Sequence, residues 1–216
     1  MIEKNKIHCI DCLEGLKQLE NNSVDLVITD PPYGMGFVSN YRKIKHKAIV
    51  GDDSFPLEIL EECFRVAKKA VYVFCRWDNL SELPKPKSVL AWVKNNWSMG
   101  DLEHEHGRQW EAIAFYPQEG HKFIKRIPDV ISCDRTGNDL HPTQKPLKLI
   151  RTIIHSNKGN LVLDPFMGSG TTAVACKELG RDFIGFEIDK EYVEVANKRL
   201  KQSVLPTLDK YREDSK

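Results

Sequence analysis

The sequence predicts an α/β protein built on a doubly wound, mostly parallel β-sheet with helices on both faces. Seven short apolar runs alternate with segments of helical periodicity along most of the chain. The runs are apolar throughout rather than at every second position, and such strands need cover on both faces. Ligands of such sheets bind beyond the carboxyl ends of the strands, so residues that directly follow a strand are candidates for a site.

The predicted elements alternate regularly within one domain that spans residues 1–216. The strands are Ile7–Ile10, Val24–Thr29, Ala70–Cys75, Ser88–Val93, Glu111–Tyr116, Leu161–Leu163 and Phe183–Phe186. Apolar spacing predicts helices over Leu13–Leu19, Pro56–Ala67, Pro146–His155, a segment after Gly170, and Lys190–Leu200. The stretch at about residues 117–140 has little periodicity and contains Pro, Gly and basic residues, which predicts a short insertion rather than a core element.

Composition limits the location and the redox chemistry of the chain. No apolar run approaches the length of a membrane span and the N-terminus lacks targeting character, so we expect a cytoplasmic protein without membrane association. The six cysteines are then expected to be reduced and mostly buried. Cys9 and Cys12 have the spacing of half a zinc site, but no second pair stands at a suitable distance, so no metal is expected.

The net charge of +1 does not by itself indicate a nucleic-acid partner. Two basic stretches with interleaved aromatic residues, Tyr41–Lys47 and His121–Arg126, suggest phosphate contacts beside a stacking surface. On charge alone, two solvated loops are the simpler interpretation. The candidate phosphate-binding side chains are Arg42, Lys43, Lys45, Lys47, Lys122, Lys125 and Arg126.

The segment Asp30–Tyr33, with Pro31 and Pro32 at its centre, directly follows a predicted strand. Two consecutive prolines fix the backbone and remove amide donors, so nearby carbonyls are held without competing local hydrogen bonds. The Asp30 carboxylate and the Pro31 carbonyl then form a pair of acceptors beside the flat ring of Tyr33. This set suits a planar substrate with an NH2 group, whose lone pair the acceptors localise as charge develops. Taken alone, the segment is equally typical of a double-proline turn.

A second segment, Asp164–Thr172, also follows a predicted strand and contains a glycine-rich turn that opens a helix. Glycines let the backbone approach a ligand closely, and Asp164 can bind an ammonium group. The segment lacks the Lys and the spacing of a phosphate loop, and it does not match the dinucleotide fingerprint. Roughly twenty residues later Glu187 closes the next strand, where an acid suits a ribose diol. Loop and acid together predict a cofactor that contains a nucleoside.

Together these segments resemble the amino-methyltransferases of DNA, in the beta-class subgroup whose motif order is circularly permuted. The Asp-Pro-Pro-Tyr segment comes first here, and the Asp-Pro-Phe-x-Gly-x-Gly-Thr-Thr segment comes last. Cys9–Leu13 and His141–Pro146 agree with further segments of the family, and the resemblance covers roughly Ile7–Leu200. It implies the Rossmann-like, seven-stranded sheet of S-adenosylmethionine-dependent methyltransferases.

The resemblance also implies roles for the residues of the Asp30–Tyr33 segment. Asp30 and Pro31 would take the hydrogens of the target amino group, Pro32 would complete the rigid turn, and Tyr33 would stack on a base extruded from the duplex. In that context the basic residues after Tyr33 are expected to contact DNA phosphates.

The same resemblance assigns the cofactor pocket. Asp164 would meet the methionine ammonium of S-adenosylmethionine, Glu187 the ribose hydroxyls and Asp11 the adenine. Phe166 is expected to line the pocket, although an aromatic residue there is also compatible with simple packing. The other residues expected at the cofactor are Cys12, Gly168, Ser169, Gly170, Thr171 and Ile188, with Thr143 and Lys145 near the methionine carboxylate.

The implied reaction is methyl transfer to N6 of adenine in double-stranded DNA. Asp as the first residue of the proline segment favours adenine, whereas Ser there is more typical of N4-cytosine enzymes, which use the same mechanism. The Asp and the motif order both disfavour methylation of a protein glutamine. RNA as substrate stays open, and a non-catalytic binding module is disfavoured because every chemical position holds a competent residue.

The short insertion is expected to read the DNA sequence. Because it is short, we expect either a short recognition site in the DNA or a second subunit that shares the recognition of the DNA sequence. Members of the subgroup often dimerise, so a homodimer is compatible with the resemblance, as is a place in restriction–modification.

Overall fold

The computed structural model describes residues 2–33, 57–97, 103, 104, 106–136 and 144–202. Several residues singled out above lie outside the described residues, so their roles stay predictions. These are Arg42, Lys43, Lys45, Lys47 and Thr143.

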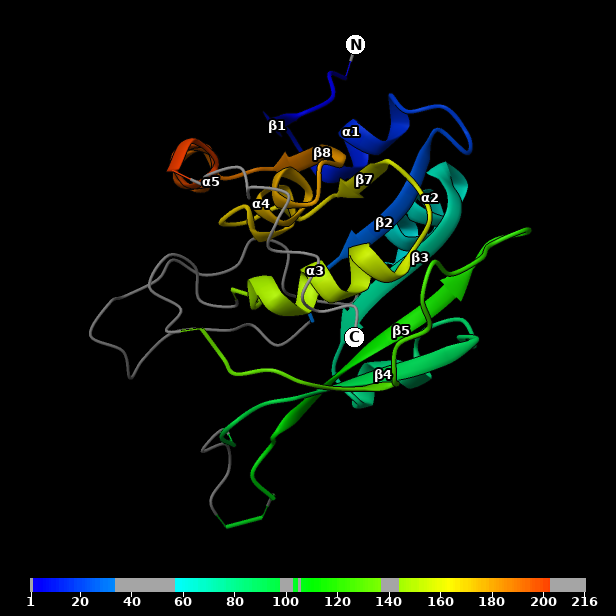
Figure 1. The fold of residues 1–216 in the computed structure, drawn as a ribbon, viewed down its shortest axis with the longest axis vertical. Coiled ribbons are helices and arrows are strands. Elements are labelled where there is room, and N and C mark those ends of the chain that lie inside the picture. Colours follow the sequence, from blue (N-terminus) through cyan, green and yellow to red (C-terminus); the bar gives the residue numbers. More distant parts are fainter. Residues whose placement is uncertain (1, 34–56, 98–102, 105, 137–143, 203–216) are drawn as a thin grey trace.

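Within the described residues the sheet has eight strands in the spatial order β1-β8-β7-β2-β3-β5-β4-β6 (Figure 1). Every neighbouring pair runs parallel except those that involve β5, which is antiparallel to both β3 and β4. The strands are β1 (Lys6–Cys9), β2 (Val24–Thr29), β3 (Ala67–Cys75), β4 (Ser88–Val93), β5 (Trp110–Pro117), β6 (Val130–Ser132), β7 (Leu161–Asp164) and β8 (Asp182–Glu187).

The predicted α/β class with a doubly wound, mostly parallel sheet is confirmed, but the predicted number of seven strands is wrong. All seven predicted strands are present, and β6 is added beside β4 within the stretch that was expected to be an insertion. Only Ile131 of this strand is buried, so three residues carry no periodic signal. Phe123 and Ile127 of the same stretch also pack against the core.

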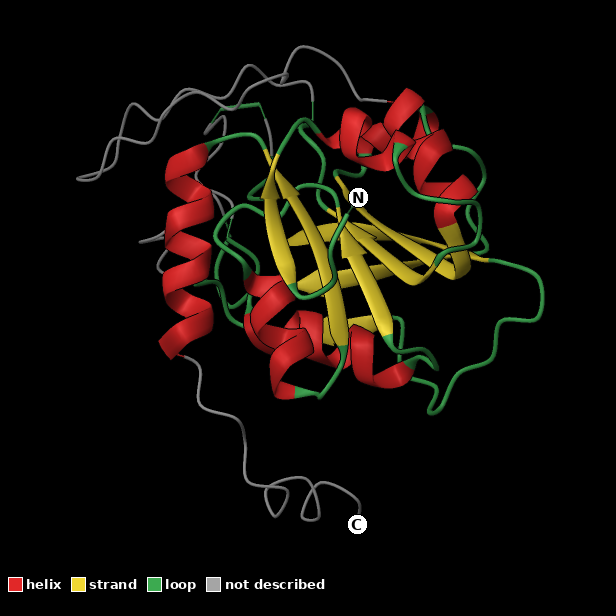
Figure 2. Ribbon diagram, turned by 90° about the horizontal axis from the view of Figure 1, so that it is seen from above, coloured by secondary structure: helices red, strands yellow, loops and turns green. Residues whose placement is uncertain are grey.

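Helices cover both faces of the sheet (Figure 2). The helices are α1 (Cys12–Lys17), α2 (Leu57–Val66), α3 (Leu147–Ser156), α4 (Thr171–Glu178) and α5 (Lys190–Gln202). A short 3-10 turn, Asp78–Ser81, follows β3. The prediction that α2 extends to Ala67 is wrong, because Ala67 already pairs with Val24 as the first residue of β3.

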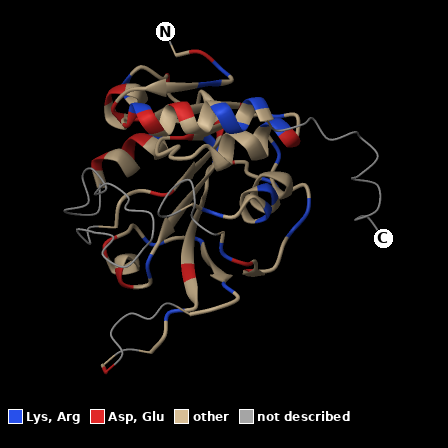
Figure 3. Cartoon of the chain, turned by 90° about the vertical axis from the view of Figure 1, so that its left-hand side faces the viewer, with Lys and Arg blue, Asp and Glu red and all other residues tan. Residues whose placement is uncertain are grey.

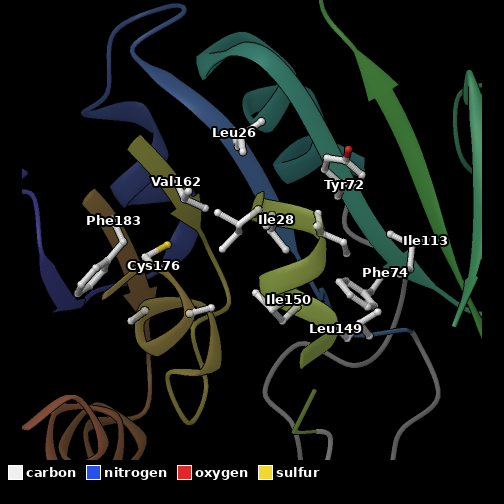
Figure 4. Close-up of a cluster of buried hydrophobic side chains, with 14 of the residues drawn as sticks. Leu26, Ile28, Tyr72, Phe74, Ile113, Leu149, Ile150, Val162, Cys176 and Phe183 are labelled. Carbon is white, nitrogen blue, oxygen red and sulfur yellow. The ribbon is translucent and has the colours of Figure 1, made fainter. Parts of the chain in front are cut away.

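The two faces of the sheet carry separate apolar clusters because successive side chains of a strand point to opposite sides. In β3, Tyr72 and Phe74 pack with α3, α4 and α5, whereas Val71 and Val73 pack with α1 and α2. Figure 4 shows the first cluster, in which Leu149 of α3 lies over Phe74 of β3. Burial on both faces explains why the strands are apolar at every position.

The junction between α3 and β7 is polar but completely paired. Asn157 is fully buried, and its amide donates to the Tyr72 hydroxyl at 2.9 Å and to the Ile153 carbonyl at 2.7 Å. The Asn157 side-chain oxygen lies 2.8 Å from Nε2 of His121. The bond from Asn157 holds His121 at the edge of the sheet where the parallel strands begin. At the same edge the Gln118 amide donates to the Lys69 carbonyl near the start of β3.

Replacement of Ile153 by Ala tests whether the contact of α3 with the sheet stabilises the fold. Ile153 is fully buried, so Ile153→Ala should lower the free energy of unfolding by about 3 kcal/mol through lost burial and a residual cavity. Urea denaturation of both proteins would measure the difference. Leu57→Ala is the matched control, because Leu57 is 46% exposed and should change stability by less than about 0.5 kcal/mol. Equal losses in the two variants would contradict the packing described here.

Candidate active site

Four carboxylates follow the ends of four neighbouring parallel strands. Asp11 follows β1, Glu187 ends β8, Asp164 ends β7 and Asp30 follows β2, and these strands are adjacent in the order β1-β8-β7-β2. The register aligns Cys9 with Glu187 and Asp164 with Gly185. The carboxyl ends of parallel strands meet at one edge of the sheet, so the four acids line that edge, as the sequence predicts.

Asp30 is held by two donors of this chain. The Tyr33 hydroxyl donates to Oδ1 of Asp30 at 2.6 Å, and Nζ of Lys145 lies 2.5 Å from Oδ2. Lys145 directly precedes Pro146, the cap of α3, and the start of α3 therefore brings the ammonium to the end of β2. The Lys145 side chain is 8% exposed and that of Asp30 is 21% exposed, so the pair is largely shielded from water.

Burial dominates the electrostatics of this pair. Burial raises the pKa of the Asp30 carboxyl, and the Lys145 ammonium and the Tyr33 hydroxyl offset only part of that effect. Burial lowers the pKa of Lys145, but the carboxylates of Asp30 and Glu111 outweigh it, so the pKa of Lys145 lies above its ordinary value. Burial, followed by the charge of Asp30, raises the pKa of Tyr33 well above its ordinary value. Lys145 is therefore a cation and Tyr33 a neutral donor in this site.

A chain of buried charges continues behind Lys145. Glu111 at the start of β5 lies with Oε2 at 3.6 Å from Nζ of Lys145, and its Oε1 accepts from Lys94 at 2.5 Å. Lys94, directly after β4, is only 5% exposed. Burial raises the pKa of Glu111, but Lys145 and Lys94 outweigh it and the pKa is lowered. Sequence reasoning missed Glu111 and Lys94, because only the antiparallel entry of β5 at this edge brings them to Asp30.

Asp164 is the most strongly shielded carboxylate of the row. Its Oδ1 accepts from the Phe166 amide at 3.0 Å and its Oδ2 from the Thr172 hydroxyl at 2.6 Å. Burial raises the pKa of Asp164 to about 7, although both hydrogen bonds oppose the shift. A buried carboxyl with this pKa gains stabilisation from a cationic ligand, which fits the predicted ammonium contact.

The glycine turn is held between β8 and α5. Gly168 donates its amide to Oε2 of Glu187 at 2.8 Å. Gly170 has a φ of 83°, and a Cβ there would lie 2.7 Å from the Cβ of Ala196 in α5. Arg199 of α5 donates to the Ser169 carbonyl at 2.6 Å and to its hydroxyl at 3.0 Å. Arg199, which sequence reasoning also missed, fixes the loop that was expected to hold the cofactor.

Arg199 also lies 3.3 Å from the Thr171 hydroxyl. The side chains of Ser169 and Thr171 thus have partners within the chain, and their predicted cofactor contacts stay untested. Phe166 is partly buried and lines a small apolar hollow with Thr29, Pro31 and Leu60. Pro31 and Phe166 both line this hollow, so the two predicted segments meet there.

The remaining predicted cofactor residues follow β1 and β8. Asp11 caps α1, with its Oδ1 accepting from the amides of Leu13 at 2.9 Å and Glu14 at 3.2 Å. Cys12 is buried among apolar residues, and burial raises the pKa of its thiol to about 12. Ile188 is 51% exposed directly after Glu187, which leaves an apolar face beside that carboxylate.

The basic residues Lys122, Lys125 and Arg126 are not brought together with Asp30. They are exposed in the loop beside Asn157, at the opposite edge of the sheet. Figure 3 shows Lys and Arg mixed with Asp and Glu on the helices of the viewed side, in line with the small net charge. A role of the His121–Arg126 stretch in phosphate binding beside the active site therefore gains no support from the fold.

Two further observations concern metals and membranes. In the described part of the chain, no group of three or more His, Cys, Asp or Glu side chains lies together as metal ligands would. No helix among the described residues is long and apolar enough to cross a bilayer.

The sheet order, the row of carboxylates and the glycine turn define a methyltransferase of the Rossmann-like α/β class. The N6/N4 methyltransferase family, described as DNA methylase, matches residues 81–198 of the chain. The chain belongs to this family of DNA methylases.

Individual relatives agree with that membership. The type II methyltransferase M.HpaI of Haemophilus parainfluenzae is 31% identical over 90% of this chain and 74% of its own length. The DNA adenine methyltransferase YhdJ of Escherichia coli (strain K12) is 28% identical over 88% of this chain and 80% of its own length. The crystal structure of an M1.HpyAVI–SAM complex superposes with a TM-score of 0.69 at 30% identity, covering 90% of this chain and 99% of the other.

The raised pKa of Asp164 has a consequence for stability. Its folded pKa of about 7 lies above the ordinary value of 3.8, so the folded protein binds the extra proton between these values and loses stability as pH rises through them. The stability of Asp164→Asn relative to the unsubstituted protein should therefore increase as pH rises from about 4 to about 7, and should be constant at higher pH. Thermal unfolding across this range would measure the change. A constant difference between the two proteins would show that the Asp164 carboxyl titrates normally.

Proposed function

We propose that this DNA methylase transfers its methyl group to N6 of adenine in a base flipped out of double-stranded DNA. The observation that carries the proposal is the environment of Asp30. Both of its oxygens accept from donors in the same shielded place, one from Tyr33 and one from Lys145. Each of these oxygens has a second lone pair, with which Asp30 can accept from an exocyclic amino group. The 28% identity to an adenine methyltransferase supports adenine as the base.

The residues present fit S-adenosylmethionine as the methyl donor. The cofactor has an ammonium, a ribose diol and an adenine, and carboxylates stand at Asp164, Glu187 and Asp11 in that order along the edge of the sheet. The oxygens of Glu187 accept the amides of Gly168 and Asp189, which hold the carboxylate in place and leave lone pairs for hydroxyl groups. When bound, the cofactor supplies an electrophilic methyl group on a sulfonium.

The residues at the end of β2 act on the target amino group. Its lone pair is delocalised into the base, so the free amine is a weak nucleophile. Hydrogen bonds to Asp30 and to the Pro31 carbonyl stabilise the charge that develops on nitrogen during attack. One N–H bond breaks after the N–C bond forms, and Asp30 is positioned to hold the released proton, because burial raises its pKa. Tyr33, oriented by its bond to Asp30, is expected to stack on the base.

The alternative base is cytosine, methylated at N4. The family includes both target atoms in its name, and the chemistry at Asp30 is the same for either exocyclic amine. The test is methyl transfer from labelled S-adenosylmethionine to unmethylated, PCR-amplified DNA, followed by nucleoside analysis. N6-methyladenine is the expected product. N4-methylcytosine would overturn the choice of base. Methyl transfer to RNA in a parallel assay, with none to DNA, would overturn DNA as the substrate.

Removal of the Asp30 carboxylate tests its role directly. Asp30→Ala should lower the rate of methyl transfer at least about a hundredfold, because an acceptor that acts in the transition state is lost. Binding of S-adenosylmethionine, measured by calorimetry, should stay within about threefold, since Asp164 and Glu187 are unchanged. Glu62→Gln is a matched control, because Glu62 pairs with Arg65 on α2 away from the row of acids. Full activity of Asp30→Ala would exclude this site.

The basic stretch after Tyr33 is proposed to contact DNA phosphates. A Lys43→Glu, Lys45→Glu variant should bind duplex DNA more weakly. The salt dependence of its affinity should also be shallower, because about two fewer counterions are released on binding. Fluorescence anisotropy at several salt concentrations measures both quantities. Lys122→Glu, Lys125→Glu is the comparison pair, at the edge of the sheet away from Asp30, and it should leave DNA affinity nearly unchanged. An equal effect of the two pairs would rule out a special role for Lys43 and Lys45.

A further inference from the structure

In this structure both oxygens of Asp30 accept hydrogen bonds from the protein itself. Tyr33 occupies Oδ1 and Lys145 occupies Oδ2. The ammonium of Lys145 is a stronger donor than a neutral amine, because hydrogen bonds between ionised groups are roughly twice as strong as neutral ones. Each oxygen keeps a second lone pair, but the ammonium weakens Oδ2 as an acceptor for any further donor. A substrate amino group therefore binds Oδ2 most strongly when Lys145 moves away, and a buried cation needs another partner in order to move.

Glu111 offers that partner. Its Oε1 accepts from Lys94, whereas its Oε2 is buried and, among the described residues, accepts no hydrogen bond. This oxygen forms an ion pair with Lys145, whose Nζ lies 3.6 Å away, beyond hydrogen-bond distance but within reach of a small rotation of the lysine side chain. A buried acceptor without a donor is unfavourable, so the position next to Lys145 is prepared for one more hydrogen bond.

We propose that Lys145 exchanges between Asp30 and Glu111, and that Glu111 is a positioning residue that receives the lysine when the target amino group binds Asp30. The inference rests on the proposed role of Asp30. No covalent bond changes in the exchange: one hydrogen bond to Asp30 is replaced by one from the substrate, and the orphaned oxygen of Glu111 gains a donor.

The surroundings suit a lysine with two positions. The backbone is fixed, because Lys145 is followed by the buried Pro146 that caps α3. Nζ lies 5.2 Å from the centre of the Phe74 ring and 5.7 Å from that of Tyr33, so aromatic rings lie close to the cation in its position beside Asp30. Two lysines and two carboxylates form a neutral group, and the exchange keeps that group neutral while an uncharged amine enters.

A double-mutant cycle between Glu111 and Lys145 tests the exchange. Glu111→Gln weakens the alternative partner, so Lys145 should hold Asp30 more tightly and kcat/KM for DNA should fall about tenfold, the size of one pairwise coupling. In the Lys145→Met background no lysine competes for Asp30, and Glu111→Gln should cost less than about twofold. Glu62→Gln serves as the charge-loss control in both backgrounds, with no loss expected.

Three outcomes decide the proposal. Rescue by Lys145→Met supports the exchange, whereas equal losses in both backgrounds assign Glu111 a purely structural role and overturn it. If Lys145→Met transfers no methyl, the same cycle is measured on the Kd for duplex DNA, where additive effects would overturn the exchange. If Glu111→Gln does not fold, the double variant Lys94→Met, Glu111→Gln takes its place. It also removes the Lys94 ammonium, which would otherwise stay buried without its carboxylate partner. Failure of the unsubstituted protein to methylate DNA would instead refute the proposed function.

Discussion

Parallel pairing of β1, β8, β7 and β2 is the constraint on which the site depends. It brings four strand ends to one edge, and residues at these ends become neighbours although they lie far apart in the chain. The two apolar clusters that cover the sheet fix the register and leave the carboxylates in partly shielded positions. Burial then sets their chemistry, because it raises the pKa values of Asp30, Asp164 and Glu187 together. This edge of the sheet therefore carries carboxyl groups that are stabilised by a ligand with a positive charge or a hydrogen-bond donor.

Elements with a strong local signal were predictable from the sequence. The apolar strands and the helices have clear periodicity, and the acids at Asp30, Asp164 and Glu187 directly follow strands, so the edge that holds the site could be predicted. β6 could not, because three residues with a single buried side chain owe their conformation to pairing with β4. The end of α2 was misplaced because Ala67 suits a buried helix as well as a buried strand, and only its pairing with β2 decides between them.

The partners of the site residues were less predictable than the residues themselves. Lys145 was expected near the cofactor from its place in a motif, but it lies 2.5 Å from Asp30, a residue 115 positions earlier in the chain. Glu111 and Lys94 carry no motif and meet only through the β4–β5 pairing. Arg199 similarly reaches the glycine turn from a different helix. Such contacts are set by tertiary packing, and single residue types in a sequence do not encode them.

The close approach of Gly170 to Ala196 makes α5 part of the cofactor side of the molecule. A larger side chain at either position would push the glycine turn and α5 apart, because a Cβ at Gly170 would already lie 2.7 Å from the Cβ of Ala196. Arg199, one turn further along α5, ties the same turn through the Ser169 carbonyl. The inner face of this helix is therefore under the same steric restriction as the loop itself, and substitutions on α5 should be tolerated best on its solvent side.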